Sequence, residues 1–535
     1  MSGEKLALRG RIVTMNSDFD VLQDGVVYVD GDSIAFVQPA AAAVPAAFAG
    51  VTVTRTAGTV YPGLMELHNH LAYNALGLWN VPKRFQNRSQ WPREAEYHEL
   101  VTGPMGAVGA SNDHQVLPAL VRWVEAKCLL AGVTTSQGIR LASSAKTPRY
   151  FKGLVRNAES PSNKELVSAA SRIPDVAARD WKMFDRELAK ATQRGSCMLL
   201  HLSEGLDAAA RAHFTALKSG DEWALSSSMA GIHCAALEAA DFDTMAANGA
   251  AMVWSPLSNY LLYGGTARID AALKSGVRVA LGSDWSPTGS KNLLGELKVA
   301  RLVAHELELP LTDRDLALMV TRTAADILGW QKYAGSIEAG KLADFAVVRG
   351  HTGDAYAHLL SAKETDIALV MIGGTARFGE VSLLQALGVS GEALTIAGEA
   401  RTANFHDPAA DPEIEAVPLS LAKEVLSDVL ANLPNLTARE SKGQGARGMA
   451  LSAEPPRVRL ALDEQEPHAD ELRPRLPFDG RSTGSSGAEL AAPPVALKAL
   501  TLDPLTVADD PHFAGKIAGQ LNLPAFLKQG LARAF

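Results

Sequence analysis

The sequence predicts an α/β fold, with a mainly parallel central sheet and a smaller sheet to which both ends of the chain contribute. Between residues 62 and 334, apolar strand-like runs alternate with stretches of helical periodicity, which is the pattern of βα units. Short strands broken by Asp- and Gly-containing turns precede this region and return after it. Several central strands end in a histidine or an aspartate, which is where a (β/α)8 barrel places its catalytic groups.

The composition is typical of a globular enzyme. The 535 residues are 47% apolar and 21% charged. A net charge of −8 and the lack of any Lys- and Arg-rich run argue against a nucleic-acid partner. We expect no membrane span and, because residues 1–10 lack a signal-peptide pattern, a cytoplasmic location. Cys128, Cys197 and Cys234 stand apart among apolar neighbours, which predicts core residues in a reducing compartment.

The first unit, residues 1–61, is predicted to form part of the smaller sheet. Its strand signals lie at residues 6–15, 25–30 and 33–37, and residues 51–61 lead into the central unit.

The second unit, residues 62–334, is the predicted region of βα units. After its first strand comes a polar and aromatic excursion at residues 71–113, and long loops of this kind in compact domains are usually functional. Apolar residues then recur at helical spacing over 116–130. We also expect strands at 132–138 and 151–156, and helices at 181–194, 291–306 and 312–328.

Two further units complete the chain. Residues 335–400 return to strand signals, over 335–348 and 367–374, which we expect to pair with those of the first unit. Residues 401–535 hold 14 of the 27 prolines and a Gly- and Ser-rich piece at 482–487. We therefore expect a Pro-rich extension that wraps the core, mostly as loop, with anchoring helices at 419–431 and 514–533.

His68 and His70 stand two residues apart at the end of an apolar, strand-like run. Side chains at i and i+2 of a strand point the same way, so both imidazoles can reach one metal ion. A His-x-His pair in a turn is the plain alternative, because short motifs often match by chance. The metal hypothesis therefore depends on ligands from other strands.

Polar side chains follow four later apolar runs in the central unit. They are His201 with Glu204 three residues on, His233, the stretch Ser255-Pro-Leu-Ser-Asn259, and Asp284. Alone, each has a structural explanation, either as a hydrogen-bonded core histidine or as a helix N-cap. Together they would leave unpaired buried charge, which is costly unless a divalent metal compensates it. Imidazole and carboxylate ligands suit zinc, with iron, manganese or cobalt as alternatives.

These motifs, in this order, resemble the amidohydrolase superfamily and within it the cytosine deaminase and chlorohydrolase branch. Pro62-Gly63 before His68, the His201-x-x-Glu204 pair, His233 and Gly282-Ser-Asp284 carry the resemblance over about residues 4–380. It implies a distorted (β/α)8 TIM barrel with a small flanking β-sandwich. It also implies one metal held by His68, His70, His201 and Asp284, with His233 on the attacking water or substrate oxygen and Glu204 as general acid/base. A homodimer is a further implication.

Two departures from the family pattern bear on the site. Members with two metals use a carboxylated lysine near the end of the fourth strand, whereas Lys152 stands at the beginning of the expected strand, so we expect one metal. Trp285 directly follows Asp284, where a small residue is common, and would reshape the pocket. The other candidate substrate contacts are Tyr73, Trp91, Tyr97 and Asn259, with Tyr260 and Tyr263 as further aromatic candidates.

We therefore expect a metal-dependent hydrolase that acts on a carbon–nitrogen bond of a small molecule. The leading version is deamination of a nitrogen heterocycle through a metal-bound hydroxide, with Glu204 protonating the nitrogen and Asp284 with His233 steadying the oxyanion. Hydrolysis of a cyclic or acyl amide, or dehalogenation, by the same groups is the alternative. A metal-free scaffold on a degenerate barrel is a third, and it predicts missing ligands.

Overall fold

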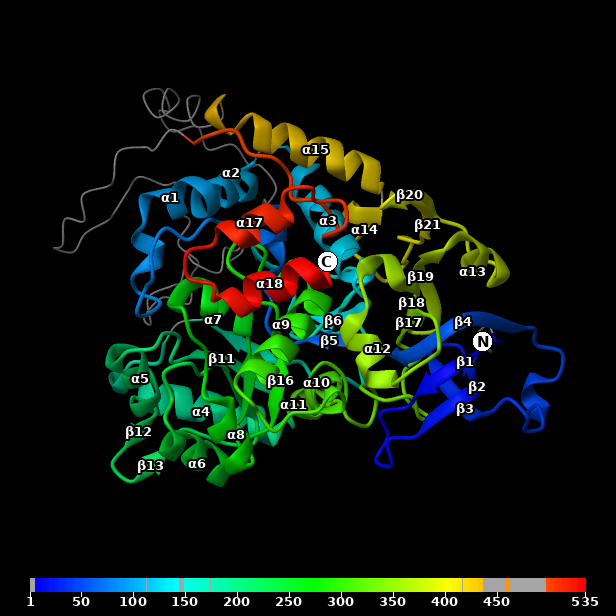
Figure 1. The fold of residues 1–535 in the computed structure, drawn as a ribbon, viewed down its shortest axis with the longest axis horizontal. Helices are drawn as coiled ribbons and strands as arrows, with labels where there is room; N and C mark the ends of the chain where they lie inside the picture. The colour runs from blue at the N-terminus through cyan, green and yellow to red at the C-terminus, as the bar shows by residue number, and fades with distance from the viewer. Residues whose placement is uncertain are drawn as a thin grey trace.

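The computed structural model describes residues 5–111, 113–143, 149–173, 175–415, 417–435, 458–460 and 497–535. Figure 1 shows a central α/β body, with a β-rich part to one side of it that combines the first strands (blue) with later ones (yellow-green).

Eight parallel strands form the central part, in two sheets. One sheet has the order β5-β6-β9 and the other β10-β11-β14-β15-β16. The two sheets meet at both edges: the Ala169 amide donates to the Ala158 carbonyl at 2.8 Å, and Asn69 pairs with Asp284 in an isolated parallel bridge. The strands are β5 (Leu64–Glu66), β6 (Val133–Ser136), β9 (Arg156–Asn157), β10 (Ala170–Arg172), β11 (Met198–Leu202), β14 (Met229–His233), β15 (Ala251–Trp254) and β16 (Val279–Leu281).

Between β6 and β10 the described residues form no helix, and elsewhere helices alternate with the strands. They are α3 (Val116–Leu130), α4 (Trp181–Gln193), α5 (Ala208–Thr215), α6 (Ala239–Ala247), α7 (Pro256–Tyr263), α8 (Ile269–Ser275), α9 (Leu293–Glu306), α10 (Asp313–Met319) and α11 (Arg322–Leu328). Helix α3 has the bounds that its periodicity predicts. Helix α4 ends just before Gly195, whose positive φ of 65° is typical of a glycine after a helix C-terminus. The single helix expected at 312–328 is two helices, because the backbone at Thr321 leaves the helical region with ψ of −100°.

The strand expected at 151–156 is wrong in its extent. Strand β9 begins only at Arg156, because the Val155 amide donates to the Glu125 side chain at 3.1 Å instead of to a neighbouring strand. Lys152 is exposed and its amide donates to Asp411 Oδ2 at 3.1 Å.

The first and later strands share one nine-stranded sheet, in the order β20-β21-β19-β18-β17-β4-β1-β2-β3. Strand β4 pairs in parallel with β1 and antiparallel with β17, and it leads directly into β5, so the sheet is anchored to the central part. Its elements are β1 (Lys5–Val13), β2 (Val21–Asp30), β3 (Ser33–Pro39), β4 (Val53–Pro62), β17 (Phe345–Arg349), β18 (Ile367–Ile372), β19 (Thr375–Glu380), β20 (Glu392–Ile396) and β21 (Glu399–Ala403), with helices α12 (Ala355–Ser361) and α13 (Val381–Ala386).

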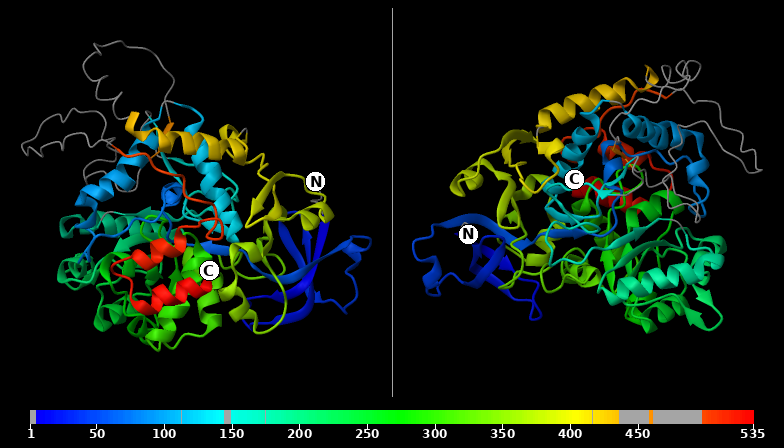
Figure 2. Two further views of the ribbon diagram at one scale, coloured as in Figure 1. Left: turned by 45° about the horizontal axis from the view of Figure 1, so that its top comes forward. Right: turned by 180° about the vertical axis from the view of Figure 1, so that it is seen from behind.

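Described parts of the last unit pack on the central helices. Helix α15 (Leu419–Ala431) has its predicted bounds and lies along α3. Helix α18 (Ala525–Ala534), which is red in Figures 1 and 2, lies on α9. The helix expected at 514–533 is two, α17 (Phe513–Gly519) and α18, because Pro524 occupies the N-cap of the second. The Gly- and Ser-rich piece at 482–487 lies outside the described residues.

Smaller elements occupy the connections. They are α1 (Ala95–Tyr97), α2 (Gly103–Ala110), β7 (Arg140–Ser143), β8 (Arg149–Tyr150), β12 (Lys218–Ser219), β13 (Glu222–Trp223), α14 (Pro412–Glu415) and β22 (Val458–Leu460). Within the part of the chain that the structure describes, no helix combines the length and the apolar character needed to span a bilayer.

Candidate metal centre and catalytic pocket

The side chains predicted from separate strand ends converge on one point. His68 and His70 follow β5, His201 lies in β11, His233 is the last residue of β14, and Asp284 follows β16. All five are more than nine-tenths buried. Because parallel strands present their carboxyl ends at the same edge, residues more than 200 positions apart become neighbours.

The distances between the donor atoms fit one small divalent ion. His201 Nε2 lies 3.1 Å from His68 Nε2 and 3.2 Å from His70 Nε2. Asp284 Oδ1 lies 3.3 Å from His68 Nε2 and 3.5 Å from His70 Nε2. Ligand atoms about 2.0–2.1 Å from a tetrahedral zinc ion would be roughly 3.3 Å apart. His68, His70 and Asp284 form one candidate group of ligands, and His68, His201 and His233 form another.

The protonation of these groups also suits a metal. Burial, followed by repulsion from the neighbouring imidazoles, holds the pKa of His68 well below its ordinary value, and burial lowers that of His201 in the same way. His68 Nδ1 lies 2.7 Å from Ser255 Oγ, so a proton on Nδ1 leaves a lone pair on Nε2 facing the cluster. Burial raises the pKa of Asp284, opposed by His70 and His233, and a cation at this position would favour the carboxylate.

Backbone strain concentrates at the same strand ends. Ser203, His233, Cys234 and Asp284 all have positive φ, of 52°, 67°, 48° and 66°. Each such residue costs roughly 1–3 kcal/mol and persists only where its surroundings fix it, as at functional sites. Here the Asp284 amide donates to the His68 carbonyl at 3.0 Å, and the His70 amide to the Asp284 carbonyl at 2.7 Å. These bonds fix the loop of one ligand against the loop of two others.

A buried carboxylate that the sequence reasoning missed joins the same two loops. Glu66 accepts hydrogen bonds from the Ser283 amide at 2.9 Å and from Asn69 Nδ2 at 2.9 Å. Gly282 allows this approach, because a Cβ there would lie 2.5 Å from the Cβ of His68. The signal in the sequence was a carboxylate two residues before His68 inside an apolar run.

Glu204 and His233 face each other beside the donor cluster. Their Oε2 and Nε2 atoms are 3.7 Å apart. Asn259 Oδ1 lies 2.9 Å from His233 Nδ1 and orients that ring, and the Tyr263 hydroxyl donates to Glu204 Oε1 at 2.7 Å. Arg88 Nε lies 3.6 Å from Glu204 Oε2 on another side.

A pocket opens above these groups. Its lining comprises His70, Arg88, Trp91, Ile173, His201, Glu204, His233, Asp284 and Trp285. Trp91 and Trp285 are thus the two predicted substrate contacts on the wall. Arg88 and Ile173 were missed, since no motif marks them.

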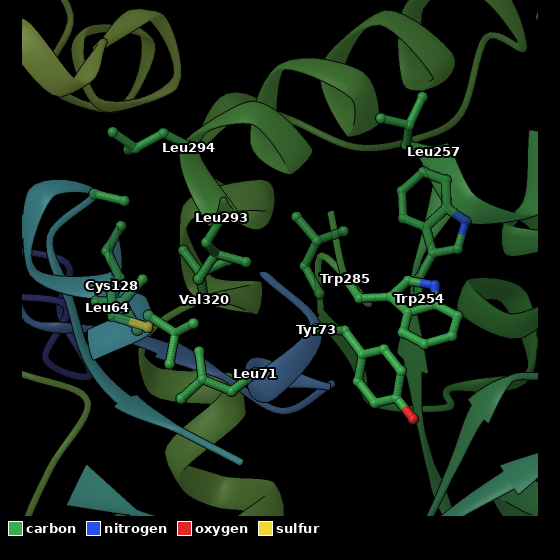
Figure 3. Close-up of a cluster of buried hydrophobic side chains, with 14 of the residues drawn as sticks. Leu64, Leu71, Tyr73, Cys128, Trp254, Leu257, Trp285, Leu293, Leu294 and Val320 are labelled. Atoms are coloured by element: carbon green, nitrogen blue, oxygen red, sulfur yellow. The ribbon is translucent and has the colours of Figure 1, made fainter. Parts of the chain in front are cut away.

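The remaining predicted substrate contacts lie behind that wall. Tyr73 packs on Trp285 with ring centroids 4.8 Å apart, inside the buried cluster of Figure 3, and Tyr97 packs on Trp91 at 5.0 Å. Asn259 is fully buried against His233. Tyr73 and Tyr97 thus pack against residues of the wall, and Asn259 supports His233.

Comparisons with known proteins agree with this geometry. A 5-methylthioadenosine/S-adenosylhomocysteine deaminase of Symbiobacterium thermophilum is 24% identical over 419 residues, which cover 69% of this chain and 93% of the relative. An imidazolonepropionase of Caulobacter vibrioides is 26% identical over 400 residues, which cover 65% of this chain and 94% of the relative.

Solved structures show the same fold at lower identity. An adenosine deaminase of Xanthomonas campestris with bound zinc has a TM-score of 0.53 at 18% identity, covering 70% of this chain and 92% of that one. An atrazine chlorohydrolase of Arthrobacter aurescens complexed with zinc has a TM-score of 0.52 at 20% identity, covering 69% and 94%. These likenesses and the eight parallel strands show a TIM-barrel-type α/β fold.

The model of the amidohydrolase family matches residues 59–377. That span is more than half of the chain and contains every residue of the donor cluster. The chain therefore belongs to the amidohydrolase family, the metal-dependent hydrolases that its motifs predicted.

Proposed function

We propose that this protein deaminates a nitrogen heterocycle by hydrolysis, with one divalent ion held by His68, His70, His201 and Asp284. The observation that carries the proposal is the convergence of three buried imidazoles and one carboxylate beside Glu204 and His233. Zinc is the first candidate, with iron, manganese and cobalt as alternatives. When bound, such an ion supplies a Lewis acid that makes water nucleophilic near neutral pH.

The chain's own residues move the protons. Water adds to the amine-bearing sp2 carbon, Glu204 takes a proton from that water, and the same carboxyl delivers it to the ring or departing nitrogen. His233, oriented by Asn259, holds the attacking oxygen, and Asp284 accepts the second proton on the way to ammonia. The products are the carbonyl compound and ammonia.

The cavity supports a flat, aromatic substrate. Trp91 and Trp285 line it as an edge-to-face pair, with ring centroids 6.2 Å apart and ring planes at 64°, so they offer aromatic surface to a heterocycle. Arg88 provides a donor to a ring nitrogen or oxygen. The names of the relatives make amino-substituted purines and their nucleosides the first compounds to test. Amide hydrolysis and dehalogenation remain the alternatives, because they need the same water and the same acid/base.

A panel assay on zinc-loaded protein separates these reactions. We expect ammonia release from adenosine, 5-methylthioadenosine or guanine, and a fall of about 10²–10⁴-fold in kcat for Glu204→Gln. The matched control is Glu165→Gln, at an exposed glutamate away from the donor cluster, which should turn over like the parent. Ring opening of a cyclic amide without ammonia would favour the amidase, and chloride release from atrazine the dehalogenase.

We propose five further properties of this protein. We propose that the eight strands close into one barrel, since both edges of the two sheets already touch, and that the flanking sheet is a β-sandwich. The proposed units are residues 1–61, 62–334, 335–400 and 401–535, the last wrapping the core, and limited proteolysis tests these boundaries. A homodimer, by family resemblance, and a cytoplasmic location are tested by light scattering and cell fractionation.

A further inference from the structure

Residues 497–535 lie beyond the span that the family model matches, yet they are built into the central part. Asp503, Thr506 and Gln520 are almost fully buried there. Charged and amide side chains of this kind are seldom buried unless they are paired, so their partners indicate what the segment does.

Asp503 pairs with two lysines from different parts of the central region. Its Oδ2 accepts from Lys127 Nζ of α3 at 2.6 Å and from Lys291 Nζ, just before α9, at 2.7 Å. All three side chains are at least nine-tenths buried. Asp510 adds a second carboxylate to Lys291 at 3.2 Å. Two buried ammonium groups therefore depend on carboxylates from the C-terminal segment.

From this ion cluster, hydrogen bonds lead to both ligand loops. Lys127 Nζ also donates to the Asn74 carbonyl at 2.5 Å. The Asn74 side chain accepts from the Ser286 amide at 2.8 Å and donates to Asn69 Oδ1 at 3.0 Å. Asn69 lies between His68 and His70, and Ser286 lies two residues after Asp284. Asn74 thus ties the two loops together, and the ion cluster fixes its backbone.

A second contact from the same segment supports the cavity wall. Gln520 accepts from the Val81 amide at 3.2 Å and donates to the Trp79 carbonyl at 2.9 Å. The Trp79 amide in turn donates to the Pro287 carbonyl at 2.8 Å, in the loop after Asp284. The chain then continues to Arg88 and Trp91 on the wall.

We propose that residues 497–535 clamp the catalytic site, with Asp503 and Gln520 as positioning residues. Asp503 fixes the two ligand loops through Lys127 and Asn74, and Gln520 fixes the segment that brings Arg88 and Trp91 to the cavity. Neither residue touches the proposed substrate. The clamp rests on the proposed function only for its effect on turnover, because its effect on loop order can be measured without any substrate.

Hydrogen exchange on the full chain tests the clamp directly. In Asp503→Asn, which keeps the shape and removes the charge, we expect amide exchange in peptides covering residues 71–83 and 283–292 to speed up by about 10-fold or more. The control is Lys498→Ala, which removes an exposed ion pair of the same segment, at 3.0 Å from Glu99. It should leave both peptides unchanged. Unchanged exchange in Asp503→Asn as well would overturn the proposal.

Gln520→Ala provides the second variant, in case Asp503→Asn does not fold. It should speed exchange at 71–83 while leaving 283–292 closer to the parent, because it leaves the lysine cluster intact. If the amides of residues 71–83 exchange in this variant at the rate of the parent, Gln520 does not fix the segment that carries the cavity wall.

Turnover supplies the readout that separates positioning from folding. With zinc-loaded protein and the best heterocyclic amine of the panel, we expect kcat to fall by about 10- to 100-fold for Asp503→Asn at unchanged zinc content, and KM to rise for Gln520→Ala. Parental kinetics in both variants would overturn the positioning role. If the parent releases no ammonia from any compound, the proposed function fails and the exchange experiment still decides the clamp.

Discussion

At the scale of single residues, Glu204 is held by neighbours that belong to no motif. Trp91 Nε1 donates to the Tyr263 hydroxyl at 2.9 Å, and that hydroxyl donates to Glu204 Oε1 at 2.7 Å. Burial, followed by the Glu204 carboxylate, raises the pKa of Tyr263 well above its ordinary value, so the phenol stays a donor. These two hydrogen bonds fix Oε1 of Glu204, and Oε2 of the same carboxylate faces His233.

Tyr263→Phe should therefore slow turnover without emptying the metal site. Loss of a hydrogen bond to a charged group costs about 1.5–3 kcal/mol, so we expect kcat to fall by roughly 10-fold or more while the zinc content stays the same. Steady-state kinetics with metal analysis measures both quantities. Tyr260→Phe on the same helix is the control, since its ring packs on Phe526. Equal kcat in both variants would argue against the role of Tyr263.

At the scale of elements, helix α3 carries a carboxylate into the interior next to β9. Glu125 is buried, and its Oε1 accepts from the Val155 amide at 3.1 Å. Burial raises the pKa of Glu125 to about 7. Because this hydrogen bond occupies the Val155 amide, β9 begins only at Arg156. The Glu125 side chain therefore sets the start of a strand and also gives the fold a pH response.

The sign of this pH response follows from the raised pKa. A carboxyl whose folded pKa is about 7, against about 4.5 unfolded, favours the folded state at low pH. That contribution, roughly 3 kcal/mol by the usual conversion, is lost as the pH rises through the folded pKa. Glu125→Gln has no carboxyl to titrate at this position. The free energy of unfolding of this variant should therefore fall less than the parent's between pH 5 and pH 8.

Urea unfolding at the two pH values measures this difference. The exposed Glu424→Gln on α15 is the matched control and should follow the parent. Parallel pH profiles for the parent and Glu125→Gln would show that Glu125 does not titrate in this window.

At the scale of the whole molecule, strands from two sheets and the last residues of the chain meet around one cluster of ligands. Without an ion, the cluster keeps four buried donors facing one another. An ion that binds the folded state alone stabilises it by about 2.7 kcal/mol at 100 times its Kd. The whole fold should therefore respond to the metal.

Removal of the metal should lower the Tm by several degrees, and zinc should restore it. In His68→Ala we expect this zinc-dependent rise in Tm to disappear. His114→Ala, at an exposed histidine outside the cluster, should keep it. Differential scanning calorimetry with and without chelator measures the rise. No zinc-dependent rise in either the parent or His68→Ala, with no transition metal bound to the purified parent, would favour the metal-free scaffold.

The local pattern of the sequence determined a large part of this molecule. Periodicity placed α3 and α15 within their observed bounds, because a helix that buries one face must repeat its apolar residues at helical spacing. The polar ends of apolar runs located His68, His70, His201, His233 and Asp284, because parallel strands gather their carboxyl ends at one edge. The family followed from the order of those motifs.

Only the tertiary structure decided which residues form the walls and supports of the site. Arg88, Tyr263 and Glu66 act through contacts between segments far apart in the chain, and no local pattern encodes such contacts. Tyr73 and Tyr97 are aromatic, as the residues of the wall are, and only their packing on Trp285 and Trp91 shows that they lie behind it. The role of Asp503 depends on two lysines 376 and 212 positions away, so a sequence read in order shows only an aspartate before a proline.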